Sequence, residues 1–381
     1  MSRIPRPGGG VVAWSDDNDV AMSEPAGALQ PALPRGLLIL LGLASAVIVV
    51  FGMRTLQDLI GPVFLALVLT IVTQPLRYVL QRKMPSWAAS VVCLIAMYAL
   101  ILGLALAIVI SAARFATLLP TYQDQFADTV ADASAWLKTL GVDSTQLQKI
   151  TSGFDLTDLG GVVTSILASV LDLVSNLAFL IALGLFMTID GSTFPNQMAA
   201  AAEERPHLIA ALTRFAWGTR RYLWVSTVFG FIVAVLDTIA LYLLDIPAPL
   251  LWGLLAFLTN YIPNIGFIIG LIPPAILGLL EGGVSKMLAV IAVYSILNVI
   301  IQSGIQPKVV GDAVGLSTTL TFVSLVFWAW VIGPLGALLA IPLSLLVKAL
   351  LVDADPDSRW MLPLVANSPG SDPPKPPSLE E

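Results

Sequence analysis

A single carboxylate lies deep inside an apolar segment of this sequence. Asp237 stands in FIVAVLDTIALYLL, about four residues from the middle of segment 222–244, which corresponds to about 6 Å along a helix axis. A charge near the centre of a bilayer costs roughly 2.5 to 3.5 kcal/mol on insertion scales, so an acid at this depth is a candidate proton or cation carrier, or a contact for a polar substrate. The alternative is a carboxyl that is kept neutral or satisfied by a neighbouring helix. Asp172, another acid within an apolar segment, lies nearer an end and can reach water.

Amide side chains recur every four residues along a second apolar segment. Asn298, Gln302 and Gln306 share one helical face at this spacing. Lipid offers amides no hydrogen-bond partners, so this face must meet protein or water. The functional interpretation is that the amides line a transport pathway, and the alternative is that they bond helices together.

Two apolar segments contain residues that break helices. The first, 250–280, carries NYIPNIG and then a proline pair, and the second, 318–350, carries GPLG and then a later proline. The residues concerned are Asn260, Pro263, Asn264, Gly266 and Pro273 in the first segment, and Gly333, Gly336 and Pro342 in the second. Proline lacks an amide donor and clashes with the preceding turn, so each helix must kink or split there.

A split helix exposes backbone groups that lipid cannot satisfy, so each break must face protein or a wet cavity. Discontinuous helices of this kind build binding sites in secondary transporters, and Asn260 and Asn264 would add neutral hydrogen-bonding groups beside the first break. The shared order of glycine-rich turn, apolar half-helix and proline suggests that the two segments are distant repeats. Against this, glycine and proline are common in membrane helices, and Gly266-x-x-x-Gly270 also suits close packing.

The elements that must position these residues are membrane-spanning helices. Hydrophobic residues make up 57% of the 381-residue chain and charged residues 12%, and the mean hydropathy is +0.88. We predict an all-α integral membrane protein of about eight transmembrane helices, with seven or nine as alternatives, because a span needs about 20 apolar residues. The predicted spans are 37–53, 56–76, 87–113, 162–189, 222–244, 250–280, 287–306 and 318–350.

The remaining segments complete the predicted organisation. The ends are rich in Pro, Gly and Asp, and they cannot bury enough apolar surface to fold. We predict disordered cytoplasmic tails at 1–35 and 351–381, three transmembrane helices in 36–113, an extracytoplasmic helical insertion at 114–161, and a transport core at 162–350 with a cytoplasmic loop at 190–221. With the N-terminus inside, 14 of the 19 lysines and arginines fall on the inner side, so both termini are expected in the cytoplasm.

Several classes of function lack their residues. There is no Walker A sequence and no HExxH motif, and His207 and Cys93 are the only histidine and cysteine. ATP hydrolysis, zinc proteolysis, Ser-His-Asp catalysis and thiolate metal clusters are therefore not expected, and neither are a cofactor and a resident metal. No basic face suits nucleic acid.

The broken segments resemble those of a known family. The runs YIPNIGFIIGLIPPAILGLLEGG, QPKVVGDAVGLSTTLTFVSLVFWAW and IGPLGALLAIPLSLLVKAL look like the C-terminal half of AI-2E family transporters, and the arrangement agrees over roughly residues 37–350. The resemblance implies an eight-helix permease of the bacterial inner membrane that exports the quorum-sensing signal autoinducer-2 or exchanges sodium for protons. It assigns Pro263, Gly266 and Pro273 to the helix break, Gln306, Pro307 and Gly311 to a turn, and Gly333, Gly336 and Pro342 to the last broken helix. Asn264 stands where members often have an apolar residue.

A secondary transporter is the leading hypothesis for function. Its partners would be membrane lipids and either a small polar solute or a monovalent cation and protons. Asp237 would be the coupling carboxylate, with the Pro263 break and the amide face forming the pathway. The alternatives are a passive channel and a membrane scaffold without transport. The glycine-rich spans suit contacts within or between chains, so a homo-oligomer stays open.

Overall fold

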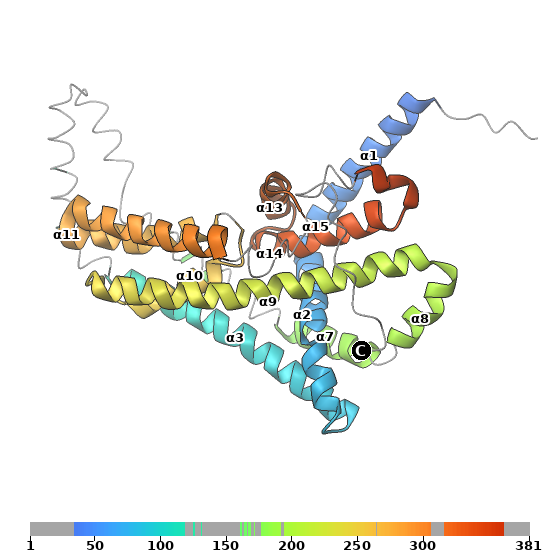
Figure 1. The fold of residues 1–381 in the computed structure, drawn as a ribbon, viewed down its shortest axis with the longest axis horizontal. Helices are drawn as coiled ribbons and strands as arrows, with labels where there is room; N and C mark the ends of the chain where they lie inside the picture. The colour runs from blue at the N-terminus through green and yellow to red at the C-terminus, as the bar shows by residue number, and fades with distance from the viewer. Residues whose placement is uncertain are drawn as a thin grey trace, which may run out of the picture. The chain divides into compact units, whose positions relative to one another are not determined.

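The computed structural model describes residues 34–118, 177–191, 194–263, 265–305 and 316–361, with eight single or paired positions between 125 and 171 (Figure 1). The chain divides into two compact units, Met1–Val49 and Val50–Glu381. The described part of the first unit is Pro34 and the start of helix α1 (Arg35–Thr55). Every regular element in the described ranges is helical, which confirms the all-α prediction.

The second unit begins with long apolar helices. They are α2 (Gln57–Gln81), α3 (Ser86–Leu118) and α7 (Leu177–Asp190). These three helices pack against one another, and the hydroxyl of Tyr98 in α3 donates to the carbonyl of Leu180 in α7. Within the described residues, four helices are long and apolar enough to cross a membrane, and shorter apolar helices accompany them. Large apolar side chains also cover outer faces, with Trp224 and Leu250 70% and 79% exposed, as expected of surfaces that meet lipid.

Helix α9 (Pro206–Leu243) is 38 residues long and follows the short helix α8 (Phe194–Glu204). The sequence predicted a cytoplasmic loop over 190–221 and a separate span from 222, whereas the structure joins residues 206–221 to the span in one helix. The reason lies in buried positions such as Ala211, Phe215 and Gly218, which continue into the apolar part at helical spacing. A continuous buried face makes one helix more stable than a loop and a span.

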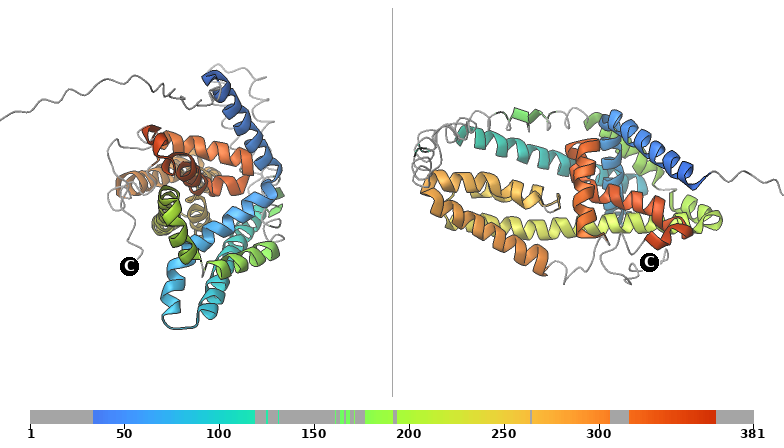
Figure 2. Two further views of the ribbon diagram at one scale, coloured as in Figure 1. Left: turned by 90° about the vertical axis from the view of Figure 1, so that its right-hand side faces the viewer. Right: turned by 90° about the horizontal axis from the view of Figure 1, so that it is seen from above.

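The segment 250–280 turns back on itself. Helix α10 (Pro249–Thr259) ends where the break was predicted, and α11 (Gly266–Asn298) begins at its glycine. The far ends of the segment come together, because Lys286 Nζ donates to the carbonyl of Asp245 at 3.0 Å and pairs with Glu281 at 3.5 Å. Residues 250–280 therefore form a hairpin rather than one straight crossing, and α9, α10 and α11 run side by side (Figure 2).

Helix α11 is itself divided at its middle. Gly282 and Gly283 leave helical geometry, and Gly283 has a φ of 69°, a conformation that glycine adopts without steric cost. The second half of α11 then returns along the hairpin and continues into the π-helix η2 (Val299–Ile305). The second half of α11 consequently brings its C-terminal end back to the break at Asn260, where Gln302 of η2 donates to Asn260 Oδ1.

A second hairpin follows near the C-terminus. Its elements are α13 (Thr318–Ile332), α14 (Pro334–Leu338) and α15 (Ala340–Lys348), followed by the π-helix η3 (Ala349–Asp353) and the 3-10 helix η4 (Pro356–Met361). Trp328 Nε1 in α13 donates to Ser344 Oγ in α15 at 3.0 Å. The first break lies at Gly333, within the glycine-rich stretch that the sequence indicated, and a second break follows at Leu339.

Both hairpins close around a glycine that touches a carbonyl. A Cβ atom on Gly266 would collide with the carbonyl of Thr259, and one on Gly336 would collide with the carbonyl of Trp328. The same packing device at corresponding positions of the two segments supports the idea that they are repeats.

A proline in α2 is compensated by an arginine from α9. Pro75 has no amide hydrogen, so it cannot donate to the carbonyl four residues earlier, at Ile71. Arg220 Nε donates to that carbonyl at 3.2 Å, and Arg220 Nη2 donates to Gln74 Oε1 at 2.7 Å. The guanidinium thus satisfies the backbone group that the proline leaves free.

This compensation predicts coupled effects on stability. Arg220→Met should lower the free energy of unfolding by about 1–3 kcal/mol, because Ile71 and Gln74 lose a charged donor. In a Pro75→Ala background the loss should be smaller, because the alanine amide can donate to Ile71. Thermal unfolding in detergent measures the double-mutant cycle, with Arg221→Met as the control. Equal losses in both backgrounds would refute the coupling.

Candidate functional site

Asp237 lies completely buried on the inner face of α9. Its side chain is 0% exposed, and neither carboxylate oxygen has a hydrogen-bond partner among the residues that the structure describes. One turn before it, Val233 packs in a cluster with Ile301 of η2, and one turn after it, Leu241 packs in a cluster with Tyr294 of α11. Asp237 therefore faces the returning half of α11, in surroundings that are mostly apolar.

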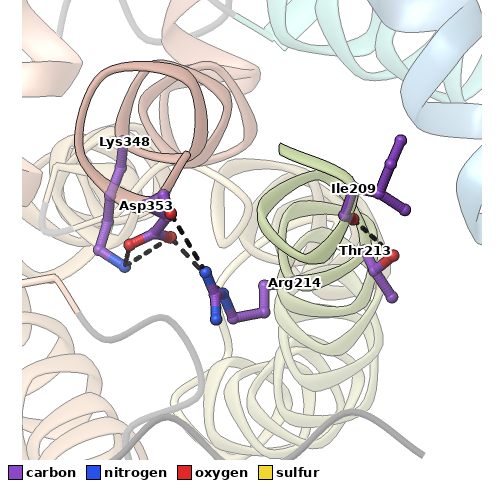
Figure 3. Close-up of polar contacts among 5 residues, drawn as sticks. All are labelled: Ile209, Thr213, Arg214, Lys348 and Asp353. Atoms are coloured by element: carbon purple, nitrogen blue, oxygen red, sulfur yellow. Dashed lines mark hydrogen bonds and ion pairs between the residues drawn. The ribbon is translucent and has the colours of Figure 1, made fainter. Parts of the chain in front are cut away.

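A second buried carboxylate shows what a structural acid looks like in this protein. Asp353 of η3 is 9% exposed, and its oxygens lie 3.3 and 3.4 Å from Lys348 Nζ and 3.9 Å from Arg214 Nε of α9 (Figure 3). Two cations offset its charge and fasten the C-terminal helices to α9. Asp237 has no such pairing among the described residues, and a buried charge without a partner is costly. An unpaired carboxylate at this buried position calls for a functional explanation.

The amide residues meet at the break between α10 and α11. Asn260 Nδ2 donates to the carbonyl of Ser226 in α9 at 3.0 Å, and Asn260 Oδ1 accepts from Gln302 Nε2 at 3.0 Å. Gln302 Nε2 also donates to Asn298 Oδ1 at 2.8 Å, and Asn298 Nδ2 donates to the carbonyl of Tyr294 at 2.9 Å. A continuous polar line thus runs from α9 through the break to the returning half of α11.

Two tyrosines fix the break against α9. Tyr222 donates from its hydroxyl to the carbonyl of Tyr261 at 2.9 Å, and the Tyr261 hydroxyl bonds Thr227 Oγ1 at 2.7 Å. These bonds satisfy part of the backbone that the broken helix leaves free, as a break at membrane depth requires.

The structure brings some predicted site residues together and separates others. Asn260, Asn298 and Gln302 are bonded in one network beside Pro263 and Gly266. Pro273 lies in α11 within the first hairpin, and Gly333, Gly336 and Pro342 belong to the second. The two breaks share a core, because Ile262 and Ile265 pack on the cluster that contains Ile341 and Leu343. Asn264, Gln306, Pro307, Gly311 and Asp172 lie outside the described residues.

Tyr294, Ser226 and Tyr261 belong to the site but were not among the residues predicted from the sequence. Tyr294 could have been found, because it precedes Asn298 by one helical turn and extends the amide face by one position. The backbone carbonyl of Ser226 carries no sequence signal at all.

The amide network makes a prediction about stability. Gln302→Leu should cost about 1–3 kcal/mol in the free energy of unfolding, because the oxygens of Asn260 and Asn298 lose their donor. Gln197→Leu on the exposed face of α8 is the control and should change little. Thermal unfolding in detergent compares the two variants. Equal melting temperatures would show that the network adds nothing to stability.

Two surface hollows open near the end of α9, and Asp237 lines neither. One of about 690 Å³ is lined by apolar side chains together with Thr238 and, at its edge, Arg114 of α3. The other, of about 410 Å³, is lined in part by Asp245 and Glu281. The described residues contain no group of three or more His, Cys, Asp or Glu side chains that could hold a metal ion. Asp237 is thus closed off from both hollows in this conformation.

Comparison with known proteins identifies relatives along most of the chain. Residues 39–354 match the family model described as AI-2E family transporter. The AI-2 transport protein TqsA of Escherichia coli (strain K12) is 30% identical over 316 residues, covering 82% of this chain and 91% of TqsA. The putative transport protein YhhT of the same strain is 31% identical over 329 residues, covering 82% and 90%. A shorter match, 26% identical over 171 residues and covering 44% and 47%, is to a sodium-lithium/proton antiporter of Halobacillus andaensis.

Proposed function

The chain belongs to the AI-2E transporter family, and we propose that it is a secondary transporter in which Asp237 couples movement of a cation or proton to transport. Membership in this family supports a role in membrane transport. The observation that carries the coupling role is the complete burial of Asp237 on a helix long and apolar enough to span a membrane, with no hydrogen-bond partner in the described part of the chain. An acid placed in this way is a functional hypothesis by default.

The proposed cycle follows from the cost of a buried charge. With Asp237 closed off from solvent, its negative charge must be removed by a proton or offset by a cation. Either ion stabilises the occluded conformation, and release requires α9 and the α10–α11 hairpin to separate. The ion binds the conformations with different affinities, so its concentration on each side of the membrane would shift the equilibrium between them.

The amide network is the proposed contact for a polar solute. Asn260, Asn298 and Gln302 carry neutral donors and acceptors that can exchange their mutual bonds for bonds to a small uncharged molecule. Export of such a molecule fits the printed name of TqsA, and exchange of cations for protons fits the printed name of the Halobacillus relative. Both belong to the proposed class, and the experiment below separates them.

The orientation is proposed from charge. Most basic residues fall on the side of the termini, which places both termini in the cytoplasm of a bacterial inner-membrane protein. A single crossing by residues 250–280 would put Lys286 and the loop at 245–249 on opposite sides of the membrane. Lys286 Nζ donates to the carbonyl of Asp245, so Lys286 and this loop lie on the same side.

The test uses purified protein in sealed liposomes that contain a pH-sensitive dye. Sodium and proton gradients are imposed separately, and sodium-dependent proton movement is the result expected of an antiporter. If ions produce no response, labelled autoinducer-2 is the next substrate, and its uptake should depend on a gradient. Flux that ignores every gradient would favour a passive channel, and no flux of any substrate would favour a scaffold.

A further inference from the structure

Tyr294, like Asp237, carries a buried polar group without a hydrogen-bond partner among the described residues. Its side chain is 1% exposed, and its hydroxyl forms no hydrogen bond within the described part of the chain. The backbone of the same residue is held, because Asn298 Nδ2 donates to its carbonyl at 2.9 Å. Tyr98 provides the contrast, since its buried hydroxyl donates to the carbonyl of Leu180. An unbonded hydroxyl in a protein interior is rare and needs a reason.

Tyr294 packs in the same buried cluster as Leu241, one helical turn after Asp237 on α9. The phenol lies within electrostatic reach of the Asp237 charge. The two groups form no direct hydrogen bond, because none of the three oxygens has a partner among the described residues. Two packed helices, α9 and α11, therefore each bring an unpartnered polar group into the same apolar region.

We propose that Asp237 and Tyr294 form an occluded binding site for one monovalent cation, with the tyrosine hydroxyl as a ligand beside the carboxylate. A single negative charge is balanced by a single positive one, whereas a divalent ion would leave a buried net charge. A proton alone needs no second oxygen, since it binds one carboxylate oxygen covalently. A hard cation requires several oxygen ligands, and the hydroxyl supplies one. This inference rests on the proposed coupling role of Asp237.

Exchange at this site balances in protons and charge. When the cation binds, the O–H bond of protonated Asp237 breaks and the proton leaves to the solvent on the open side. When the cation leaves, a proton from solvent re-forms that bond. The phenol of Tyr294 keeps its own proton throughout and contributes a lone pair. No other charged or titratable side chain is shown facing Asp237 among the described residues.

The test measures protection of Asp237 from a hydrophobic carbodiimide, which reacts with protonated carboxylic acids in apolar sites. Full-length protein in detergent is labelled at increasing NaCl or LiCl with choline chloride keeping ionic strength constant, and the modified peptide is quantified by mass spectrometry. We expect Na⁺ or Li⁺ to protect Asp237. In Tyr294→Phe, half-protection should need about tenfold more cation, the loss expected for one neutral ligand.

The matched control is Tyr98→Phe, which also removes a buried tyrosine hydroxyl. It should lower the melting temperature because the hydrogen bond from Tyr98 to the carbonyl of Leu180 is lost, but it should leave the protecting concentration unchanged. Tyr294→Phe should not lower the melting temperature in choline chloride, because its hydroxyl has no partner to lose. Cations should also raise the melting temperature of the wild-type protein and not that of Asp237→Asn.

The outcomes separate the two proposals. Equal protection of wild type and Tyr294→Phe would overturn the role of Tyr294. No protection by any monovalent cation would overturn the cation site, while gradient-driven solute transport that is lost in Asp237→Asn would leave the proposed function standing. Transport that survives in Asp237→Asn would overturn both.

Discussion

Asp237→Asn is expected to reduce gradient-driven transport to the level of empty liposomes. Asparagine keeps the shape of the side chain but cannot release a proton or balance a cation, so the coupling step has no carrier. The fold should tolerate the change. Asp237 has no hydrogen-bond partner and no counter-ion among the described residues, so the free energy of unfolding should stay constant or rise by about 1 kcal/mol.

The control for this prediction is Asp353→Asn. Asp353 is paired with Lys348 and Arg214, so losing its charge should cost about 1–3 kcal/mol of stability while the ion dependence of transport stays as in wild type. Dye-filled liposomes report transport, and thermal unfolding reports stability. Asp237→Asn should thus lose transport and keep its stability, whereas Asp353→Asn should lose stability and keep the ion dependence of transport. Full transport by well-folded Asp237→Asn would rule out the coupling role.

Gly266→Ala is expected to destabilise the first hairpin by roughly 3 kcal/mol or more, at the upper end of overpacking effects. The added methyl group would overlap the carbonyl of Thr259, and a backbone atom cannot move aside as a flexible side chain can. The overlap would push the start of α11 away from α10 and pull Asn260 from Gln302. Both folding yield and transport should therefore fall. Gly336→Ala should act in the same way on the second hairpin, against Trp328.

Gly103→Ala on the exposed face of α3 is the matched control, because no atom lies within 4 Å of the position its Cβ would take. Alanine in an open helical position should stabilise the protein by up to about 1 kcal/mol. Expression level and thermal unfolding in detergent measure all three variants. Wild-type stability in Gly266→Ala would mean that the hairpin is not packed as tightly as the contact with Thr259 implies.

The sequence determined the class of the protein and the places where its helices break. Long apolar segments with few charges require lipid as solvent, and glycine and proline act on the backbone locally, so the breaks near Pro263 and Gly333 could be predicted without a partner. The four-residue spacing of Asn298 and Gln302 likewise set a common face. The depth of Asp237 came from its place along one helix.

Only the tertiary structure decided how these features combine. The hairpin of 250–280, the bond between Asn260 and Gln302 across 42 residues of sequence, and the contrast between unpaired Asp237 and paired Asp353 all depend on which helix faces which. In lipid, apolar residues cover both the buried and the outer faces of a helix, so hydrophobic periodicity does not show the contact face as it does in water. The spacing of Tyr294 one turn before Asn298 puts it on the amide face, but only the tertiary structure shows that its hydroxyl is buried without a partner among the described residues.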